Sequence, residues 1–136
     1  MGAGWTAVST TATLDAAELS AREARQLVRT VLADARVSTD ATETALLLVS
    51  ELVTNAVLHA DGRPVLDIAV EPDRLRIAVS DTGRGTPEVQ TDNPLLSDHG
   101  RGMLLVDTLS SRWGSEPSEV GGKCVWFELE QSPGPA

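Results

Sequence analysis

The feature that most constrains this sequence is a mostly apolar stretch from Leu46 to Ala60, which reads LLLVSELVTNAVLHA. A helix built from it is apolar nearly all round and should therefore be buried. Glu51 and Asn55 are a carboxylate and an amide that interrupt it, and because they are four residues apart they share one face of the helix. Burying a carboxylate and an amide costs free energy unless their hydrogen bonds are satisfied. The two side chains must therefore either satisfy each other or face a polar cavity that holds a ligand.

Composition narrows the class of protein. The chain has 136 residues, enough for one domain with its own apolar core. Its formal net charge of -9 argues against a nucleic acid partner, because phosphate binding needs a basic surface. The single cysteine, Cys124, excludes an internal disulfide and a multi-cysteine metal site. No apolar run approaches the roughly 18 residues of a membrane helix, and the chain start lacks the pattern of a secretion signal. We expect a cytoplasmic protein with no membrane partner.

The first half of the chain predicts one strand and two helices. Residues 5–13 are rich in Thr and Val, which favours an edge strand. Apolar residues recur at helical spacing over residues 16–35, which predicts a helix. Asp40 followed by Glu43 fits a capping box, with Asp as the capping residue. It predicts that the central helix runs over about residues 41–60.

A line of basic residues follows another face of the first helix, formed by Arg22, Arg25 and Arg29. Charged lines on a helix are most often solvated surface. The alternative interpretation is a docking surface for an acidic partner.

The second half of the chain predicts two antiparallel hairpins. Residues 66–70 and 75–79 alternate large apolar side chains with charged residues or alanine, and Pro72-Asp73 between them suits a tight turn. Residues 111–118 and 123–130 form the arms of the second hairpin.

The order of elements is strand, helix, helix, two strands, loop, helix, two strands. It predicts an α+β fold, a two-layer α/β sandwich with a mostly antiparallel, mixed sheet and helices on one face. We assign residues 1–130 to this single domain and residues 131–136 to a disordered tail.

Two glycine-rich segments mark possible ligand contacts. The strand over 75–79 leads into Asp81-Thr-Gly83-Arg-Gly85, where the backbone must bend or approach something closely. Residues 86–98 follow without periodicity and suit a lid. A second segment, Gly100-Arg-Gly, opens a helix that should run to about residue 111. Its free backbone N–H groups and positive dipole end suit a phosphate. Each glycine segment alone is weak evidence.

Three segments taken together are far more specific. ELVTNA at 51–56, DTGRG at 81–85 and GRGM at 100–103 resemble, in order and spacing, the nucleotide-binding boxes of the GHKL (Bergerat-fold) superfamily. It includes gyrase-type topoisomerases, Hsp90 chaperones, MutL-type repair proteins and histidine kinases. The resemblance covers roughly residues 5–130. The short length, His59 after the first box and the ending GGKCVWFEL resemble one branch, the bacterial anti-sigma factor serine/threonine kinases, each with a histidine kinase-like ATP-binding domain.

The resemblance implies a role for each matching residue. Asn55 matches the Mg²⁺ ligand, and one protein oxygen suffices because phosphates and water supply the others. Glu51 matches the general base that takes a proton from an attacking hydroxyl or water. Asp81 matches the carboxylate that accepts a hydrogen bond from the adenine amino group. Gly83 and Gly85 let the backbone pass close to the base and ribose.

The remaining matches concern the phosphates and the base. By resemblance, Gly100, Arg101 and Gly102 wrap the phosphates at the helix start, with Arg101 as a charge partner. Met103 stands where the family usually has Leu, a mild change. Cys124 stands where many relatives carry a Thr that holds the adenine through water, and a thiol is a weaker hydrogen-bonding group.

The resemblance implies a function and partners. The first hypothesis is a Mg²⁺·ATP-dependent protein serine/threonine kinase that phosphorylates an anti-anti-sigma (STAS-type) protein and holds a sigma factor inactive. The alternative is a nucleotide-gated protein-binding switch with little or no turnover; an intact Glu51 favours the first and Cys124 the second. Trp5, Trp113 and Trp126 are more aromatic surface than a small acidic monomer needs to expose, so a homodimer is also expected.

Overall fold

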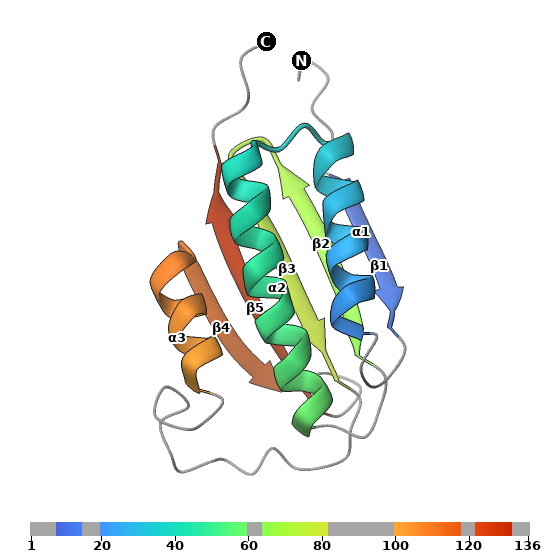
Figure 1. Ribbon diagram of the computed structural model, residues 1–136, viewed down its shortest axis with the longest axis vertical. Coiled ribbons are helices and arrows are strands. Elements are labelled where there is room, and N and C mark those ends of the chain that lie inside the picture. The colour runs from blue at the N-terminus through green and yellow to red at the C-terminus, as the bar shows by residue number, and fades with distance from the viewer. Residues whose placement is uncertain (1–7, 15–19, 60–63, 82–99, 118–121, 132–136) are drawn as a thin grey trace.

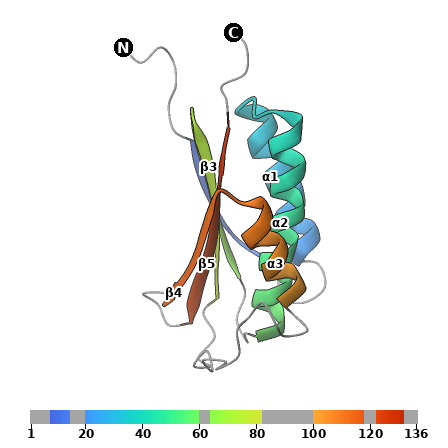
Figure 2. The same cartoon turned by 90° about the vertical axis from the view of Figure 1, so that its left-hand side faces the viewer.

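The computed structural model describes residues 8–14, 20–59, 64–81, 100–117 and 122–131. These contain eight elements: β1 (Val8–Thr13), α1 (Ser20–Asp34), α2 (Thr39–His59), β2 (Val65–Glu71), β3 (Arg74–Ser80), α3 (Gly100–Leu109), β4 (Arg112–Pro117) and β5 (Lys123–Glu130). The strands form one sheet in the order β1-β2-β3-β5-β4. Figures 1 and 2 show the three helices side by side on one face of this sheet. The predicted α+β two-layer sandwich is confirmed.

The strand predictions agree with the structure in most respects. In β2 and β3, Glu71 pairs with Arg74, so Pro72-Asp73 is the two-residue turn that the sequence predicts. β1 is an edge strand as expected, although residues 5–7 lie outside the described part. The expectation of a mixed sheet is wrong for the described strands, because each neighbouring pair is antiparallel. The turn of the second hairpin, residues 118–121, lies outside the described residues.

The core forms where α2 lies on the sheet between α1 and α3 (Figure 1). This central place explains why α2 is so apolar, because two helices and the sheet cover most of its circumference. Each fully buried large aliphatic side chain contributes about 1.5–3 kcal/mol. Leu47 is 42% exposed, so the helix is not covered all round. The largest fully buried side chains include Leu48, Leu52, Val53, Ile68, Ile77 and Phe127.

The start of α2 differs from the sequence-based expectation. The helix begins at Thr39, and the hydroxyl of Ser38 accepts a hydrogen bond from the Ala41 N–H at 3.1 Å. This is the geometry of an N-cap serine, so the prediction of Asp40 as the cap is wrong. Asp40 lies inside the first turn, where its negative charge still suits the positive end of the helix dipole.

Two sequence-based expectations concern the surfaces of the helices. Among the described helices, none is long and apolar enough to span a bilayer. Arg22, Arg25 and Arg29 are all exposed on α1, so both interpretations of this basic line stay open.

The two described tryptophans have partners within the chain. The indole N–H of Trp113 donates to the Asp107 carboxylate at 2.8 Å. Trp126 lies on the sheet face away from the helices, with the Arg76 guanidinium 4.3 Å from its ring centroid. Both are only partly exposed. These two side chains therefore give no support for a homodimer, which stays a prediction, and Trp5 lies outside the described residues.

Candidate functional site

Glu51 and Asn55 occupy the second half of α2 and are both half-buried. Leu52, Val53 and Ala56 around them are buried, which fixes the rotation of this helical segment against the sheet. No hydrogen bond or ion pair joins the two polar side chains, and neither has such a partner within the described part of the chain. The two side chains therefore do not satisfy each other's hydrogen bonds, which was the first of the two interpretations of the sequence. A half-buried carboxylate and amide are left able to bind a ligand.

Asp81 lies just beyond the end of β3 and is only 5% exposed. Its backbone N–H donates to the Lys123 carbonyl at 2.9 Å, which continues the pairing of β3 with β5 by one residue. One carboxylate oxygen, Oδ1, accepts a hydrogen bond from the Lys123 N–H at 3.3 Å. Side chains two residues apart along a strand point to the same face of the sheet, so Asp81 is on the same face as buried Val79. Its carboxylate thus belongs to the helix side of the sheet.

These elements meet at one end of the molecule. In Figure 1 the C-terminal end of α2, the end of β3, the start of β5 and the start of α3 all lie at the lower end. α2 packs directly on β3, β5 and α3. The antiparallel order produces this arrangement, because β3 and α2 run toward this end while β5 and α3 start from it. Glu51, Asn55 and Asp81 therefore come from neighbouring elements at a common end.

The start of α3 has the form that the sequence predicts. The helix begins at Gly100, so Gly100, Arg101 and Gly102 form its first turn, where backbone N–H groups lack intrahelical partners. Met103 is 6% exposed and belongs to the apolar core. It anchors the first turn of α3 against the core. The side chain of Arg101 is outside the described part.

Gly83 and Gly85 lie in residues 82–99, outside the described part of the chain. The predicted lid over 86–98 falls in the same segment. Their predicted roles stay predictions.

Cys124 lies on β5 directly after Lys123, which contacts Asp81. It pairs with Ser80. Neighbouring side chains along a strand point to opposite faces of the sheet, and the next residue, Val125, is buried under the helices, so Cys124 belongs to the face away from the helices. Asp81 belongs to the other face, that of the helices, and the β5 residue that it contacts is Lys123. This geometry counts against a contact of Cys124 with the base.

Gly122 is a site residue that sequence reasoning missed. Its φ of 74° lies in the left-handed region, and a Cβ built on it collides with the backbone carbonyl and Oδ1 of Asp81. The sequence signal was present in the pair Gly121-Gly122, which we used only as part of the ending GGKCVWFEL that resembles one branch of the superfamily. The long-range approach to Asp81 depends on the β3–β5 register and cannot be read locally.

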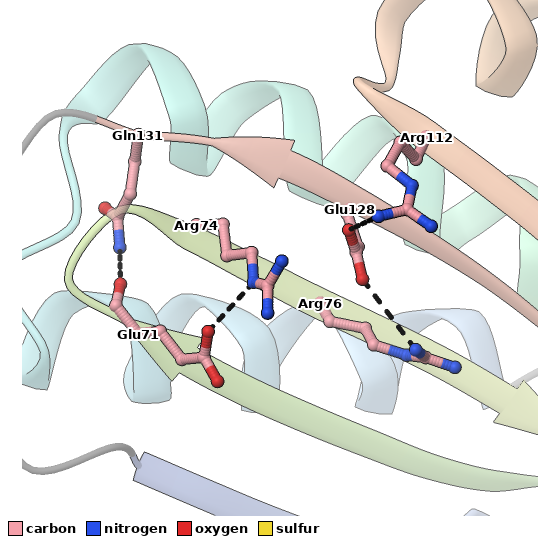
Figure 3. Close-up of polar contacts among 6 residues, drawn as sticks. All are labelled: Glu71, Arg74, Arg76, Arg112, Glu128 and Gln131. Carbon is pink, nitrogen blue, oxygen red and sulfur yellow. Dashed lines mark hydrogen bonds and ion pairs between the residues drawn. The ribbon is translucent and has the colours of Figure 1, made fainter.

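A second feature lies at the opposite end of the sheet. Figure 3 shows Glu128 between Arg76 and Arg112, with N–O distances of 3.7 and 3.8 Å. In the same view, Arg74 donates to Glu71 at 2.8 Å, which raises the pKa of the Arg74 guanidinium. A pocket of about 570 Å³ lies beside these residues, and Asp81 is not among the residues that line it. It is lined by Asp73, Arg74, Ser111, Arg112, Glu128, Glu130 and Gln131.

Comparison with known proteins agrees with this arrangement. Residues 14–129 match the family described as histidine kinase-like ATPase domain. The chain is also similar to the protein named Serine-protein kinase RsbW from three Listeria monocytogenes strains, serotype 4a HCC23 and serotypes 4b CLIP80459 and F2365. Identity to each is 32%, over 53% of this chain and 56% of the relative. The chain thus spans about half the length of these relatives.

Among the described elements, the family match leaves out β1 and the last residue of β5 and covers the other seven. It includes Glu51, Asn55, Asp81 and the first turn of α3. The superfamily predicted from the three boxes is confirmed, and an ATPase domain implies nucleotide binding. The chain belongs to the histidine kinase-like ATPase domain family.

Proposed function

We propose that this chain is an ATP-dependent protein serine/threonine kinase of the anti-sigma factor type. Its substrate is an anti-anti-sigma (STAS-type) protein, and it holds a sigma factor inactive when that protein is absent. The observation that carries the proposal is the pair Glu51 and Asn55. They are half-buried on one face of α2 without a described partner, at the same end as Asp81. The similarity to a serine-protein kinase supports the same reaction class.

Asp81 is the proposed recognition group for adenine. Its Oδ1 is occupied by the Lys123 N–H, while Oδ2 has no hydrogen-bond partner among the described residues. A carboxylate only accepts hydrogen bonds, and the adenine amino group is a donor. The buried setting excludes water and strengthens such a bond.

Glu51 is the proposed general base and Asn55 the proposed metal ligand. A protein hydroxyl must lose its proton as it attacks the terminal phosphate, and a carboxylate within reach can accept that proton. Asn55 lies one helical turn further on the same face, so its amide oxygen is presented beside the carboxylate. Bound Mg²⁺ would neutralise charge on the phosphates of the nucleotide.

The residues present fit such a metal. Among the described residues there is no cluster of three His, Cys, Asp or Glu side chains that could hold an ion by itself. Mg²⁺ in phosphate sites needs only one or two protein oxygens, so Asn55 beside a nucleotide is a sufficient donor set. The first turn of α3, Gly100 to Gly102, would receive the phosphates on its free N–H groups.

The switch alternative was favoured by Cys124. The register of β5 gives this residue less weight, because it puts the Cys124 side chain on the sheet face opposite to that of Asp81. Glu51, which favours the kinase, is half-buried and without a described partner. A cytoplasmic location and a homodimer remain part of the proposal, the latter without the support of Trp113 and Trp126.

The test is transfer of labelled γ-phosphate from ATP to anti-anti-sigma proteins encoded in the same genome. The proposal expects Mg²⁺-dependent labelling of a serine or threonine in at least one of them. Nucleotide binding together with nucleotide-dependent capture of a partner, but no labelling of any candidate, would favour the switch instead.

A further inference from the structure

We propose that the backbone of Gly122 and Lys123 sets the base specificity of the nucleotide site by fixing the carboxylate of Asp81. This inference rests on the proposed function, because it assumes that Asp81 meets the base. It assigns a positioning role to two residues that do not need to touch the nucleotide through their side chains.

The first observation is the close approach of Gly122 to Asp81. With φ of 74°, Gly122 adopts a backbone conformation that L side chains rarely accept. A Cβ at this position would collide with the Asp81 carbonyl oxygen and Oδ1 at once. The carbonyl belongs to the backbone of a residue that is bonded to β5, so it cannot rotate away as a flexible side chain could. Any side chain at 122 must therefore shift Asp81 or the backbone of residues 122 and 123 that holds it.

The second observation is the hydrogen bond from the Lys123 N–H to Oδ1 of Asp81, at 3.3 Å. A second bond runs from the Asp81 N–H to the Lys123 carbonyl, at 2.9 Å. The two bonds hold Asp81 by both its side chain and its backbone. The carboxylate then keeps one orientation, with Oδ2 left for a ligand. The first residues of β5 thus hold the carboxylate of Asp81 in place, and its Oδ2 is the atom left to accept a hydrogen bond.

A fixed acceptor discriminates between purines. Adenine carries an amino donor at its 6-position, and guanine carries a carbonyl acceptor there. A carboxylate that cannot turn away would meet the guanine carbonyl acceptor to acceptor, and sites with fixed buried polar groups reject such ligands strongly. A displaced or mobile Asp81 loses this penalty. Guanine binding should then become less unfavourable relative to adenine binding.

Two substitutions at Gly122 separate backbone strain from collision. Gly122→Ala adds both a Cβ and left-handed strain. Gly122→Asn adds the same Cβ, but Asn tolerates the left-handed region better. If collision with Asp81 is the cause, both variants change base preference. Lys123→Pro is a third variant, which leaves residue 122 unchanged. It replaces the N–H that holds Oδ1 by a ring carbon, so it removes the hydrogen bond and displaces the carboxylate; proline is tolerated at the first residue of a strand.

Gly114→Ala is the matched control in the same hairpin. A Cβ at Gly114 would lie 2.7 Å from a ring atom of Trp126, on the sheet face away from Asp81. This variant should lose stability for a similar steric reason. It leaves Asp81 and Lys123 untouched, so a loss of stability alone should not change base preference.

The experiment measures ADP and GDP affinity by calorimetry for the full chain and these variants, after thermal unfolding has shown that each is folded. We expect the ratio of GDP to ADP dissociation constants to fall about 10-fold or more in Gly122→Ala, Gly122→Asn and Lys123→Pro. Gly114→Ala should keep the wild-type ratio.

Different failures have different meanings. A wild type that binds neither nucleotide overturns the proposed function and this inference with it. A wild type that prefers ADP, beside folded Gly122 variants with the same preference, overturns the inference alone. If both Gly122 variants are unfolded, Lys123→Pro decides, and a wild-type ratio in that variant overturns the inference.

Discussion

Trp126 and Gly114 face each other across β5 and β4, and the indole of Trp126 occupies the space where a side chain on Gly114 would stand. The nearest ring atom is 2.7 Å from an ideal Cβ at position 114. The guanidinium of Arg76, on β3, lies over the same ring, 4.3 Å from its centroid. The glycine therefore lets a tryptophan stabilise the outermost strand pair from the open side of the sheet.

We predict that Gly114→Ala lowers the free energy of unfolding by about 1–3 kcal/mol, because the indole must move from a well-packed position. Chemical denaturation measures this difference. Ser115→Ala on the same strand is the control, since Ser115 is exposed and should change stability by less than about 0.5 kcal/mol. Equal stability of Gly114→Ala and wild type would show that the ring does not depend on the glycine.

The start of α2 gives a second prediction, in which sequence and structure disagree. Ser38→Ala removes the hydroxyl that accepts the Ala41 N–H and should cost about 0.5–2 kcal/mol. Asp40→Ala removes only a charge near the helix start, worth about 0.3–1 kcal/mol. Denaturant unfolding of both variants ranks them. A larger loss for Asp40→Ala would restore the capping box inferred from the sequence.

Asp81 provides a prediction about binding rather than stability. In Asp81→Asn the amide oxygen can still accept from the Lys123 N–H, so the fold should be kept. The NH₂ group would then point where Oδ2 does now and meet the adenine amino group donor to donor. Losing a hydrogen bond to a charged group costs about 1.5–3 kcal/mol, which is about 10- to 100-fold in ADP affinity. Unchanged affinity by calorimetry would remove Asp81 from this role.

Much of the fold follows from local patterns. The alternation in residues 66–70 and 75–79 with Pro72-Asp73 between them predicts a hairpin with its turn in the right place. The apolar stretch around Glu51 and Asn55 predicts the buried central helix. These signals are strong because each depends on residues close in the sequence and on a single period.

The errors arise where two local choices compete or where the answer lies across the sheet. Ser38 and Asp40 are both good capping residues two positions apart, so composition alone cannot choose between them. The cover of Trp126 depends on Arg76 and Gly114, which lie on different strands. A shift of one residue in register would move Cys124 to the other face.

The site divides in the same way. Glu51, Asn55 and Asp81 could be proposed from the sequence because they carry a family pattern. Gly122 could not, because its importance lies in the distance to Asp81 and not in its own chemistry. Only the pairing of β3 with β5 brings these two residues together.

Glu51 tests the central claim, that this end of the molecule performs phosphate transfer and not only nucleotide binding. Glu51→Gln keeps the shape of the side chain and removes its ability to accept a proton. The affinity for ATP should stay close to wild type, because the proposed ground-state contacts belong to Asp81, Asn55 and the first turn of α3.

The decisive measurement is phosphate transfer from ATP to the anti-anti-sigma partner, for wild type and Glu51→Gln side by side, with ATP affinity measured on the same samples. We predict a fall in the transfer rate of about 100-fold or more at nearly constant affinity, the usual scale for loss of a positioned base. A variant that binds ATP normally and transfers phosphate at the wild-type rate would contradict the account.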